Sequence, residues 1–540
     1  MISRRLIEAV DGLLKRERGT VYKDPGGRLN VCLVYPNTYY VGMSNLGFQG
    51  VYGLLNSRAD VLCERAFLPE DEDLKEFERT GSVLFSYETK RPLMEFDIVA
   101  FSVSFENDYL SIPTILELSR IPLYSVQRDE RHPLLLLGGV CATSNPEPLA
   151  EFFDIVYIGE AEPALLSMVE LYRKSTDRAS FLKELSGLDG FYIPGFYRIS
   201  YHSDGTIRER EALNGPQTIK KVTLKSLKQA VRHVISTPDT EFSEMALVEA
   251  MRGCVHSCRF CLAGHIYNPP RYKDFDQLKR EIEDVTGRGL RVGLIGPSLS
   301  DYKYIENALL LEGVNFSITS LRANKKTEAL LHLFKGKKSL SIAPEAGTQR
   351  LRDLINKRIS EEDILSISER VFSEGIEVLR LYFMIGLPTE TEEDISAIVE
   401  LAKKIRRLSR RGRLTLSIST FVPKPFTPFQ WLPMQEESTV KRRLRFIKDA
   451  LKAERQVTVF HDVLKYAYLQ GVLSRGDRRL SRLIASGRSM SGWKRRMVEL
   501  GLKPDFYLFR RRHRDEILPW DFIDAGVKKD YLWRQLEGIL

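Results

Sequence analysis

The segment MRGCVHSCRFCLAGHI, residues 251–266, places Cys254, Cys258 and Cys261 at the spacing CxxxCxxC, directly after an apolar run. Three thiolates on one tight loop can hold three corners of a [4Fe–4S] cubane and leave the fourth iron without a protein ligand. We therefore expect these cysteines to be the metal ligands and the centre of the chemistry. The other cysteines stand apart among apolar neighbours and are expected to be small buried residues; they are Cys32, Cys63 and Cys141.

Two alternatives to the cluster are open at this point. The spacing could arise by chance, or the cysteines could hold a structural zinc ion, which needs a fourth ligand such as His256 or His265. His256 lies inside the loop, however, and His265 just beyond it, where the geometry of a zinc site is awkward. Gly253 before the first cysteine and Phe260 before the third favour the cluster.

Strand-like apolar runs alternate with helical patterns across residues 241–435. Short apolar segments separated by helices predict parallel strands, and six βα units suit a partial (β/α)6 barrel with ligands at the carboxyl ends of its strands. The cysteine loop follows the first of these strands. The predicted strands are EMALVEAMRG (244–253), RVGLIGP (291–297), FSITSLR (316–322), SLSIAPE (339–345), VLRLYFMIG (378–386) and LTLSISTFVP (414–423).

A second alternation lies within residues 29–200 and predicts a doubly wound, Rossmann-like α/β domain. Its strands are continuously apolar, as in a parallel sheet that is covered on both faces. They are RLNVCLVYP (28–36), DVLCERAF (60–67), FDIVAFSVS (96–104), HPLLLLGG (132–139) and FDIVYIGE (153–160). The remaining ranges are an N-terminal amphipathic helix (1–28), a connector with a hairpin at Asp204-Gly205 (201–240) and a helical, basic C-terminal region (436–540).

The charge of the chain is basic, with 81 Lys and Arg against 72 Asp and Glu and a net charge of +9. Such a balance permits an acidic partner, including nucleic acid, but much of the excess lies in the C-terminal third, where solvated helix faces account for it equally simply. No apolar run approaches the roughly 20 residues that span a bilayer. The N-terminal segment lacks the apolar core of a signal peptide, so we expect a cytoplasmic protein with no membrane partner.

The cysteine loop and the barrel pattern together resemble the radical S-adenosylmethionine (SAM) superfamily over residues 241–435. The resemblance implies a [4Fe–4S] cluster, SAM and an external electron donor such as flavodoxin or ferredoxin. It places Phe260 near the adenine, Glu345 of IAPEAG near the ribose and methionyl group, and the MIGLPTET segment near the adenine through Ile385, Gly386 and Pro388. Polar residues around the third strand would also face SAM; they are Ser317, Thr319 and Arg322. The usual Gly-Gly-Glu element is replaced by Gly296, Pro297 and Ser298, which leaves recognition of the SAM amino group open.

The loops of the N-terminal domain resemble the cobalamin-binding domain that precedes many radical SAM barrels. Ligands of an open parallel sheet bind outside the carboxyl ends of its strands. The resemblance implies cobalamin contacts from the residues that follow those ends: Asn37, Tyr40, Met43, Ser44, Gly47, Ser102, Ser104, Gly138, Gly139, Ala142, Gly159, Glu160 and Glu162. No histidine precedes His132, so cobalamin would bind without a histidine ligand to cobalt. A domain that has kept the fold and lost the ligand is the alternative.

Cluster, SAM and cobalamin together imply C-methylation of an unactivated carbon. The C-terminal motifs resemble a group of cobalamin-type proteins related to the YgiQ-like set, and methanogens have a relative that methylates a glutamine Cα in methyl-coenzyme M reductase. A protein or small-molecule substrate is expected, with RNA as an alternative. The competing hypotheses are an oxidoreductase or cyclase without methyl transfer, an RNA-modifying enzyme, and a non-catalytic binding protein. A methylthiotransferase is disfavoured because the other cysteines are not grouped.

Overall fold

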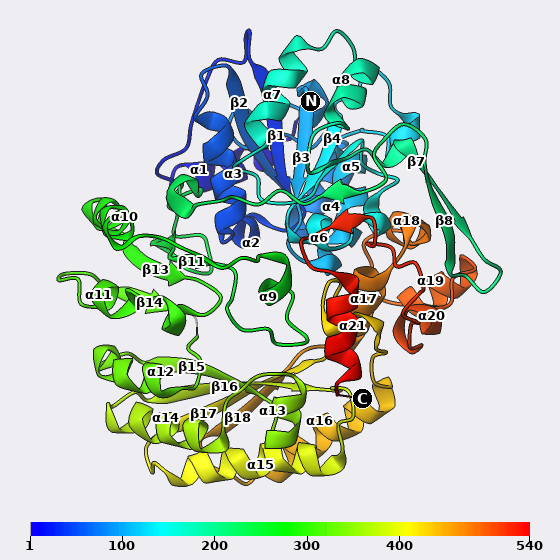
Figure 1. Ribbon diagram of the computed structural model, residues 1–540. Coiled ribbons are helices and arrows are strands. Elements are labelled where there is room, and N and C mark those ends of the chain that lie inside the picture. The colour runs from blue at the N-terminus through cyan, green and yellow to red at the C-terminus, as the bar shows by residue number, and fades with distance from the viewer. Residues whose placement is uncertain (1, 319, 540) are drawn as a thin grey trace. The chain divides into compact units, whose positions relative to one another are not determined.

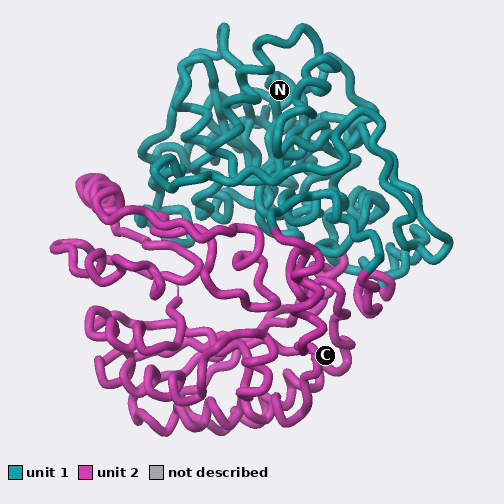
Figure 2. The backbone as a smooth tube through the Cα atoms, viewed as in Figure 1, with its two compact units in different colours: residues 1–247, 473–504, 515–526 teal, residues 248–472, 505–514, 527–540 magenta. Residues whose placement is uncertain are grey.

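The computed structural model describes residues 2–318 and 320–539, and the chain folds into two compact units (Figure 2). Unit 1 consists of residues 1–247, 473–504 and 515–526, and unit 2 of residues 248–472, 505–514 and 527–540. The range 436–540, which the sequence predicts as one helical region, is therefore divided between the two units.

Unit 1 is built on a sheet with the strand order β2-β1-β3-β4-β5-β6, in which β6 alone runs antiparallel to its neighbour (Figure 1). All five predicted strands of this domain are present, and they pair in parallel. The strands are β1 (Leu29–Tyr35), β2 (Val61–Phe67), β3 (Ile98–Ser102), β4 (Leu134–Gly138), β5 (Ile155–Tyr157) and β6 (Phe191–Tyr192). The order 2-1-3-4-5 has its topological switch point between β1 and β3, which is where ligands of this architecture bind.

Helices cover both faces of this sheet, which explains why its strands are buried along almost their whole length. The alternation of side chains along β1 sends Val31, Leu33 and Tyr35 into one core. The helices of the N-terminal part are α1 (Arg4–Leu14), α2 (Tyr39–Met43), α3 (Leu46–Asn56), α4 (Asp71–Thr80), α5 (Ile112–Leu118), α6 (Val140–Ser144), α7 (Leu165–Lys174) and α8 (Arg178–Leu185).

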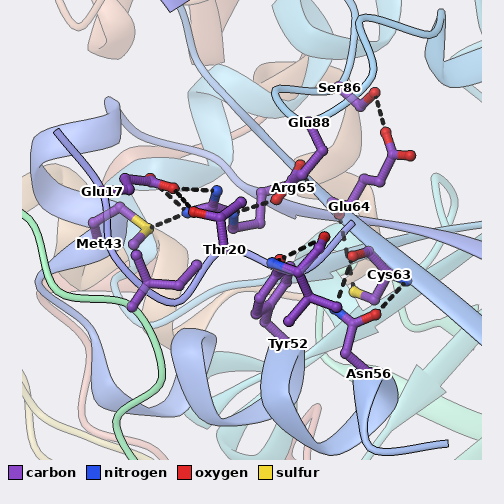
Figure 3. A network of polar contacts seen from close by, with 12 residues as sticks. Glu17, Thr20, Met43, Tyr52, Asn56, Cys63, Glu64, Arg65, Ser86 and Glu88 are labelled. Atoms are coloured by element: carbon purple, nitrogen blue, oxygen red, sulfur yellow. Dashed lines mark hydrogen bonds and ion pairs between the residues drawn. The ribbon is translucent and has the colours of Figure 1, made fainter. Parts of the chain in front are cut away.

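A buried arginine ties the segment after α1 to strand β2 (Figure 3). Arg65 is fully buried and its guanidinium donates to both carboxylate oxygens of Glu17 at 2.8 Å. Its Nε donates to Glu88 at 2.7 Å. Removing one partner of such a buried pair leaves an uncompensated charge and costs about 3–5 kcal/mol, so this network fixes the N-terminal segment on the sheet.

The predicted hairpin is confirmed, since β7 (Tyr197–Tyr201) and β8 (Ile207–Ala212) pair antiparallel. Its turn is closed by Asp204, whose Oδ1 accepts from the backbone N–H of Thr206 at 2.8 Å. C-terminal residues complete unit 1. Strand β19 (Ile523–Asp524) pairs with β9 (Ile219–Lys220), and the side chain of Asn145 donates to the carbonyl of Ser474 at 3.1 Å.

Unit 2 contains the six barrel strands that the sequence predicts, and one more. One sheet has the order β10-β13-β14 and another the order β15-β16-β17-β18. A parallel bridge between Leu321 and Ile342 joins the two. The strands are β10 (Met245–Glu249), β13 (Arg291–Ile295), β14 (Phe316–Ile318), β15 (Ser339–Glu345), β16 (Val378–Ile385), β17 (Arg413–Thr420) and β18 (Val457–His461).

The additional strand β18 lies in the stretch expected to be helical and extends the sheet beside β17. From α10 to α16 the helices of unit 2 follow its strands as in a βα repeat (Figure 1). The helices that lie wholly or mostly in this unit are α9 (Ala263–Ile266), α10 (Phe275–Gly287), α11 (Ile305–Leu309), α12 (Lys325–Leu330), α13 (Gln349–Leu354), α14 (Glu361–Ser373), α15 (Glu392–Arg407), α16 (Glu437–Leu451), α17 (Leu464–Arg475), α20 (Pro504–Leu508) and α21 (Lys529–Glu537). None of the helices within the described ranges has the length and apolar character that crossing a membrane requires.

Candidate functional site

The cysteine loop lies between the short strand β11 (Met251–Arg252) and α9, and β11 pairs with β12 (Arg271–Tyr272) beyond the loop. Two glycines let the loop close on itself. Gly253 has φ +80°, and a Cβ there would lie 2.3 Å from the carbonyl oxygen of Tyr267. A Cβ on Gly264 would lie 2.6 Å from the carbonyl oxygen of His256. Any larger side chain at either position would open the loop.

The three thiols are partly or fully buried. Cys258 is buried, whereas Cys254 and Cys261 are half-buried. Burial raises the pKa of Cys254, and burial together with the neighbouring thiols raises the pKa of Cys261 to about 11. Without a metal these thiols would stay protonated, and a cationic cluster would reverse this preference because a coordinating thiol is deprotonated outright.

Backbone amides lie close to two of the sulfur atoms. The N–H of His256 acts to lower the pKa of Cys254, and the N–H groups of Ala263 and Gly264 act to lower that of Cys261, each against the larger effect of burial. Hydrogen bonds to the sulfurs are one of the means by which proteins hold iron–sulfur clusters and set their potentials. The donor set therefore fits a [4Fe–4S] cluster ligated by the three thiolates.

The histidines do not complete a zinc site. Nε2 of His256 lies 2.7 Å from Oδ2 of Asp301, and Nδ1 of His265 lies 2.8 Å from the carbonyl oxygen of Cys261. Within residues 2–318 and 320–539, no group of three or more His, Cys, Asp or Glu side chains could hold a single metal ion. Because both histidines are engaged in these contacts, neither is placed to serve as a fourth ligand of zinc beside the three cysteines.

Asp301 is a site residue that the sequence did not single out. It follows β13 in the loop that begins with Gly296, and its side chain is only 12% exposed. Oδ2 of Asp301 accepts from Oγ of Ser298 at 2.6 Å as well as from His256. These hydrogen bonds, that from His256 most of all, lower the pKa of Asp301. Ser298 replaces part of the usual Gly-Gly-Glu element, and its hydroxyl hydrogen-bonds to Asp301 beside the cysteine loop.

A turn after α13 is a second support that sequence reasoning missed. Arg259, inside the cysteine loop, donates from Nη1 to the carbonyl of Leu354 at 2.7 Å. Asn356 donates from its side chain to the carbonyl of Ser257 at 2.8 Å. Asn356 has φ +57°, a conformation that asparagine tolerates better than most residues. The turn of residues 353–358 therefore contacts the cysteine loop and holds it in place.

Glu345, expected near the SAM ribose, ends strand β15 at a register shift. Its φ is +69°, and a non-glycine residue in this region stores strain that is typical of functional sites. Oε1 of Glu345 lies 3.0 Å from Nζ of Lys357. The following loop is held by buried Arg352, which donates to the carbonyl of Gly347 at 2.9 Å.

The segment after β16 is the one that the resemblance places near the adenine. Gly386 has φ +82°, and its N–H donates to Oε2 of Glu390 at 2.7 Å. Glu390 also pairs with Arg443 at 2.8 Å, but burial prevails and raises its pKa to about 7. Ile385 is fully buried and its carbonyl accepts from the N–H of Phe421 at 2.9 Å, while Pro388 is half-buried.

The remaining residues that are expected to contact SAM differ in their exposure and in their contacts. Ser317 is exposed on β14, opposite Gly293 of β13. Arg322 donates to the carbonyl of Arg358 at 3.3 Å and is near enough to Cys254 to lower its pKa. Thr319 lies outside the described residues. Phe260 is half-buried, Pro297 exposed and Gly296 packed so that a Cβ would lie 2.5 Å from Met251 Cγ.

In unit 1 the polar residues after β1 and β3 meet at the switch point. The side chain of Asn37 donates to Oδ1 of Asp108 at 2.8 Å, and the side chain of Asn45 donates to Oγ of Ser104 at 3.1 Å. Asp108 is buried, and this burial raises its pKa to about 7. Asp108 is a further residue that the sequence did not indicate.

Several residues expected to contact cobalamin have other roles. Met43 and Ala142 are 1% and 0% exposed, so their side chains cannot line an open site; Met43 packs against Arg65 (Figure 3). Glu160 accepts from the N–H of Leu224 at 2.9 Å, and Glu162 accepts from that of Val231 at 3.3 Å. The GEAE segment therefore anchors the connector, because its carboxylates are occupied by backbone donors.

The other expected cobalamin residues remain at the carboxyl end of the sheet. Gly139 and Gly159 have φ +100° and +133°, and a Cβ on either would meet a backbone oxygen at 2.4 or 2.3 Å. The hydroxyl of Tyr40 donates to Glu241 at 2.9 Å. Ser44 lies in the turn after α2, and Ser102 and Gly138 end β3 and β4, whereas Gly47 lies in the first turn of α3.

The three scattered cysteines do not come together. Val31 is the register partner of Cys63, whereas Glu64 is the partner of Cys32. Successive residues of a strand point to opposite faces, so the two thiols lie on opposite sides of the sheet, and Cys141 lies on α6. Burial raises the pKa of both Cys32 and Cys63 well above the ordinary value. They are buried residues, as predicted.

Comparison with known proteins agrees with the two-part organisation. A family model for "Radical SAM proteins, N-terminal" matches residues 47–194, and a model for "Radical SAM superfamily" matches residues 248–402. "Uncharacterized protein MJ0966" of Methanocaldococcus jannaschii is 30% identical over 463 residues, which cover 84% of this chain and 90% of that protein.

More distant relatives carry names of methylthio transfer. A "tRNA-2-methylthio-N(6)-dimethylallyladenosine synthase" of Pelagibacter ubique is 22% identical over 40% of this chain and 51% of that protein. A "Ribosomal protein uS12 methylthiotransferase RimO" of Thermoanaerobacter sp. is 21% identical over 65% of this chain and 82% of that protein. The solved structure of the cobalamin-dependent SAM radical enzyme OxsB is 15% identical with a TM-score of 0.48, over 69% of this chain and 52% of that one. The chain thus spans about half the length of the synthase and of OxsB.

Proposed function

Since this chain belongs to the radical SAM superfamily, we propose that it uses a [4Fe–4S] cluster, SAM and cobalamin to methylate an unactivated carbon. The observation that carries the proposal is the CxxxCxxC loop that follows the first barrel strand, closed on itself at Gly253 and Gly264. When bound, the cluster and SAM supply one-electron cleavage of a sulfonium, and cobalamin supplies a methyl group.

The residues of unit 2 would hold these groups in a fixed geometry. Cys254, Cys258 and Cys261 would bind three irons, while Asp301 and Asn356 keep the loop that carries them in place. Glu345, held by Lys357, would meet SAM from the end of β15. Such preorganised positioning is the main contribution that a protein makes when cofactors carry the chemistry.

Unit 1 supports the cobalamin part of the proposal through its topology. The order 2-1-3-4-5 creates a switch point between β1 and β3, and Gly139 permits close backbone approach there. Every histidine of the chain follows residue 131, so the loops after β1 and β3 offer no imidazole to cobalt. The polar side chains at this point include Asn37 with Asp108 and Asn45 with Ser104.

Methylthio transfer, which the distant relatives' names suggest, is not the function that we propose. A second cluster would need further grouped thiolates, and Cys32 and Cys63 face opposite sides of their sheet. The substrate that we favour is a protein side chain or backbone, such as a glutamine Cα, or a small molecule. An oxidoreductase or cyclase without methyl transfer and an RNA-modifying enzyme are the competing outcomes of the test.

The test is an anaerobic preparation analysed for iron and cobalt and then incubated with reductant, cobalamin and SAM. We expect iron–sulfur absorbance, bound cobalamin, 5′-deoxyadenosine, and S-adenosylhomocysteine from methylation of cobalt, which requires no substrate. Deoxyadenosine without cobalamin binding or S-adenosylhomocysteine would instead indicate an oxidoreductase or cyclase. Absence of an iron–sulfur chromophore after reconstitution would overturn the whole proposal.

A further inference from the structure

Strand β18 has one edge to which no other strand pairs among the residues that the structure describes. It stands last in the order β15-β16-β17-β18 (Figure 1). At one end of its pairing with β17, Leu414 donates its N–H to the carbonyl of Gln456 at 2.9 Å, and at the other Asp462 donates its N–H to the carbonyl of Ile418 at 3.2 Å. Because bonding and outward-facing residues alternate along a parallel strand, the even-numbered residues of β18 face β17.

The odd-numbered residues of β18 therefore direct their backbone groups to the open edge. They are Val457, Val459 and His461. The N–H of Val457 donates to the carbonyl of Glu454 at 3.3 Å. Within the described ranges, no other segment supplies a partner for the N–H of Val459 or of His461, or for the carbonyl of Val459. Such a row of N–H and carbonyl groups is a template on which another extended chain can pair.

The sequence of β18 does nothing to protect this edge. Edge strands are usually protected by charged residues or proline, and β18, with the sequence VTVFH, contains neither. Strand β8 of unit 1, which belongs to a sheet of only two strands, shows the usual protection, since four of its six residues are charged: Arg208, Glu209, Arg210 and Glu211. The bare edge of β18 consists instead of residues that favour extended structure.

Two exposed aromatic rings lie on the sheet face next to this edge. Ser417 of β17 is the register partner of both Tyr382 of β16 and Phe460 of β18, so these three side chains form one row on the same face. Phe460 is 60% exposed and Tyr382 39% exposed. Aromatic residues that are rigid and exposed are the usual anchors of a binding interface, and here they lie beside unpaired backbone groups.

The row is also close to the segment expected to contact SAM. Ile385 and Gly386 follow Tyr382 by three and four residues on or directly after the same strand. At about 3.3 Å per residue, Tyr382 lies about 10 Å from Ile385. A chain lying along β18 would thus have its side chains on the face that leads to the carboxyl ends of the strands.

We propose that the edge of β18 is the docking site of the substrate, and that the substrate is an extended polypeptide segment that adds to the sheet as a further strand. The inference rests on the proposed function and narrows its substrate to a peptide chain. Main-chain hydrogen bonds to Val459 and His461 would hold the segment, as in other complexes formed by strand addition. Phe460 and Tyr382 would contact its side chains.

The chemistry of the edge favours a peptide over the other substrates considered above. Nucleic acids are held largely through their phosphates by basic side chains, and β18 has none. A small molecule does not reproduce the N–H and carbonyl groups that recur every second residue, about 6.6 Å apart. A second copy of this chain would offer the same groups from its own β18, and the oligomeric state tests that occupant.

The experiment uses the full-length protein without cofactors and a random peptide library. The tightest peptide is synthesised with a fluorescent label, and its Kd is measured by anisotropy. Val459→Pro removes one outward N–H, a change that edge strands tolerate where the N–H faces solvent, while Val459→Ala keeps that N–H. Phe460→Ala is matched by Phe446→Ala, which removes a ring that is 44% exposed on α16. Thermal unfolding shows which variants are folded.

We expect Val459→Pro to weaken peptide binding about tenfold relative to Val459→Ala, as the loss of a main-chain hydrogen bond implies. Phe460→Ala should weaken binding as well, and Phe446→Ala should not. Methylation of alternate backbone nitrogens of the peptide should abolish binding in one register and spare it in the other, because only one side of an added strand faces β18. This measurement requires no variant protein.

Equal affinity of folded Val459→Pro and Val459→Ala for the peptide would overturn the proposal, and so would a library from which no peptide is selected. A dimer of the unaltered protein that dissociates in Val459→Pro would assign the edge to a second copy and overturn it too. Peptide binding needs no cofactor. Failure to form an iron–sulfur cluster would therefore refute the proposed function while leaving the peptide result intact.

Discussion

Nε2 of His256, within the cysteine loop, lies 2.7 Å from Oδ2 of Asp301, in the loop after β13. The histidine that could have served as a zinc ligand is thus engaged by a carboxylate. Because Asp301 also accepts from Ser298, the contact joins two loops that follow neighbouring strands. It therefore makes the conformation of the cysteine loop depend on the loop that follows β13.

Replacing Asp301 with Ala should loosen the loop, because His256 and Ser298 lose their shared acceptor. The loss of hydrogen bonds to a charged group costs about 1.5–3 kcal/mol, so we expect lower thermal stability and less iron retained after gel filtration. Asp301→Asn, which keeps an oxygen acceptor, should be affected less. Asp284→Ala, at an exposed position of α10, is the control. Equal iron content in all variants would show that the contact between His256 and Asp301 is dispensable.

Cys258→Ala and Cys63→Ala form a matched pair of thiol deletions. The first removes a cluster ligand and should abolish the iron–sulfur absorbance and SAM cleavage. The second removes a buried thiol in β2 and should leave both intact with a small loss of stability. The unaltered protein should bind about four irons per chain, as one cubane holds. Roughly twice that number would reveal a second cluster and contradict the separation of the scattered cysteines.

Lys357→Met should weaken SAM binding without removing the cluster. The change leaves Glu345, which is 16% exposed in its side chain, without a cation, and an unpaired carboxylate of this kind costs about 1–3 kcal/mol. Equilibrium dialysis with SAM measures the effect, and Lys357→Arg should restore part of the affinity. Lys335→Met, at an exposed position, is the control. Unaltered SAM affinity would show that Glu345 does not depend on this lysine.

The buried carboxyl of Asp108 should make the folding stability of the protein depend on pH. Its folded-state pKa is raised to about 7 from 3.8 by burial, so as pH rises from about 4 to 7 the unfolded state releases a proton that the folded state retains. The contribution of Asp108 to stability is therefore present at low pH and lost across this window, by about 3 kcal/mol.

Asp108→Asn cannot ionise and should lack this decline. Urea unfolding at pH 5 and pH 8 measures it, and the variant should gain relative to the unaltered protein at the higher pH. Asp515→Asn, which replaces an exposed carboxylate of unit 1, should follow the unaltered protein. Parallel behaviour of Asp108→Asn and the unaltered protein would mean that Asp108 is ionised at neutral pH.

Strand prediction succeeded where apolar runs were short and bounded. The five strands β1–β5 and the six barrel strands were all predicted, because each contains a short apolar run flanked by turn residues. The strands of unit 1 are buried on both faces, whereas β14, β16 and β17 each have exposed side chains among the buried ones. Strand β18 was missed. Its side chains at Thr458, Phe460 and His461 are exposed, so it lacks the continuous apolar pattern, and only its pairing with β17 makes it a strand.

The residues of the site could be predicted less completely than the strands. The resemblance led to Glu345 and Gly386, both of which have positive φ at the ends of strands. It also led to Met43 and Ala142, which are core residues, because a loop motif does not show which of its side chains point inward. Asp301, Lys357 and Asp108 carry no motif, and contacts with distant segments give them their roles.

The sequence by itself determined the chemistry of the cysteine loop, since three thiolates at this spacing specify their ligand set wherever the loop is placed. It also determined the alternation of strands and helices, since burial on both faces leaves a direct imprint on residue type. The tertiary structure alone decided which groups surround that loop. Asp301 reaches it from the loop after β13, and Asn356 and Arg358 reach it from the turn after α13, the helix that follows β15. Parallel pairing brings such segments together although they are far apart in the chain.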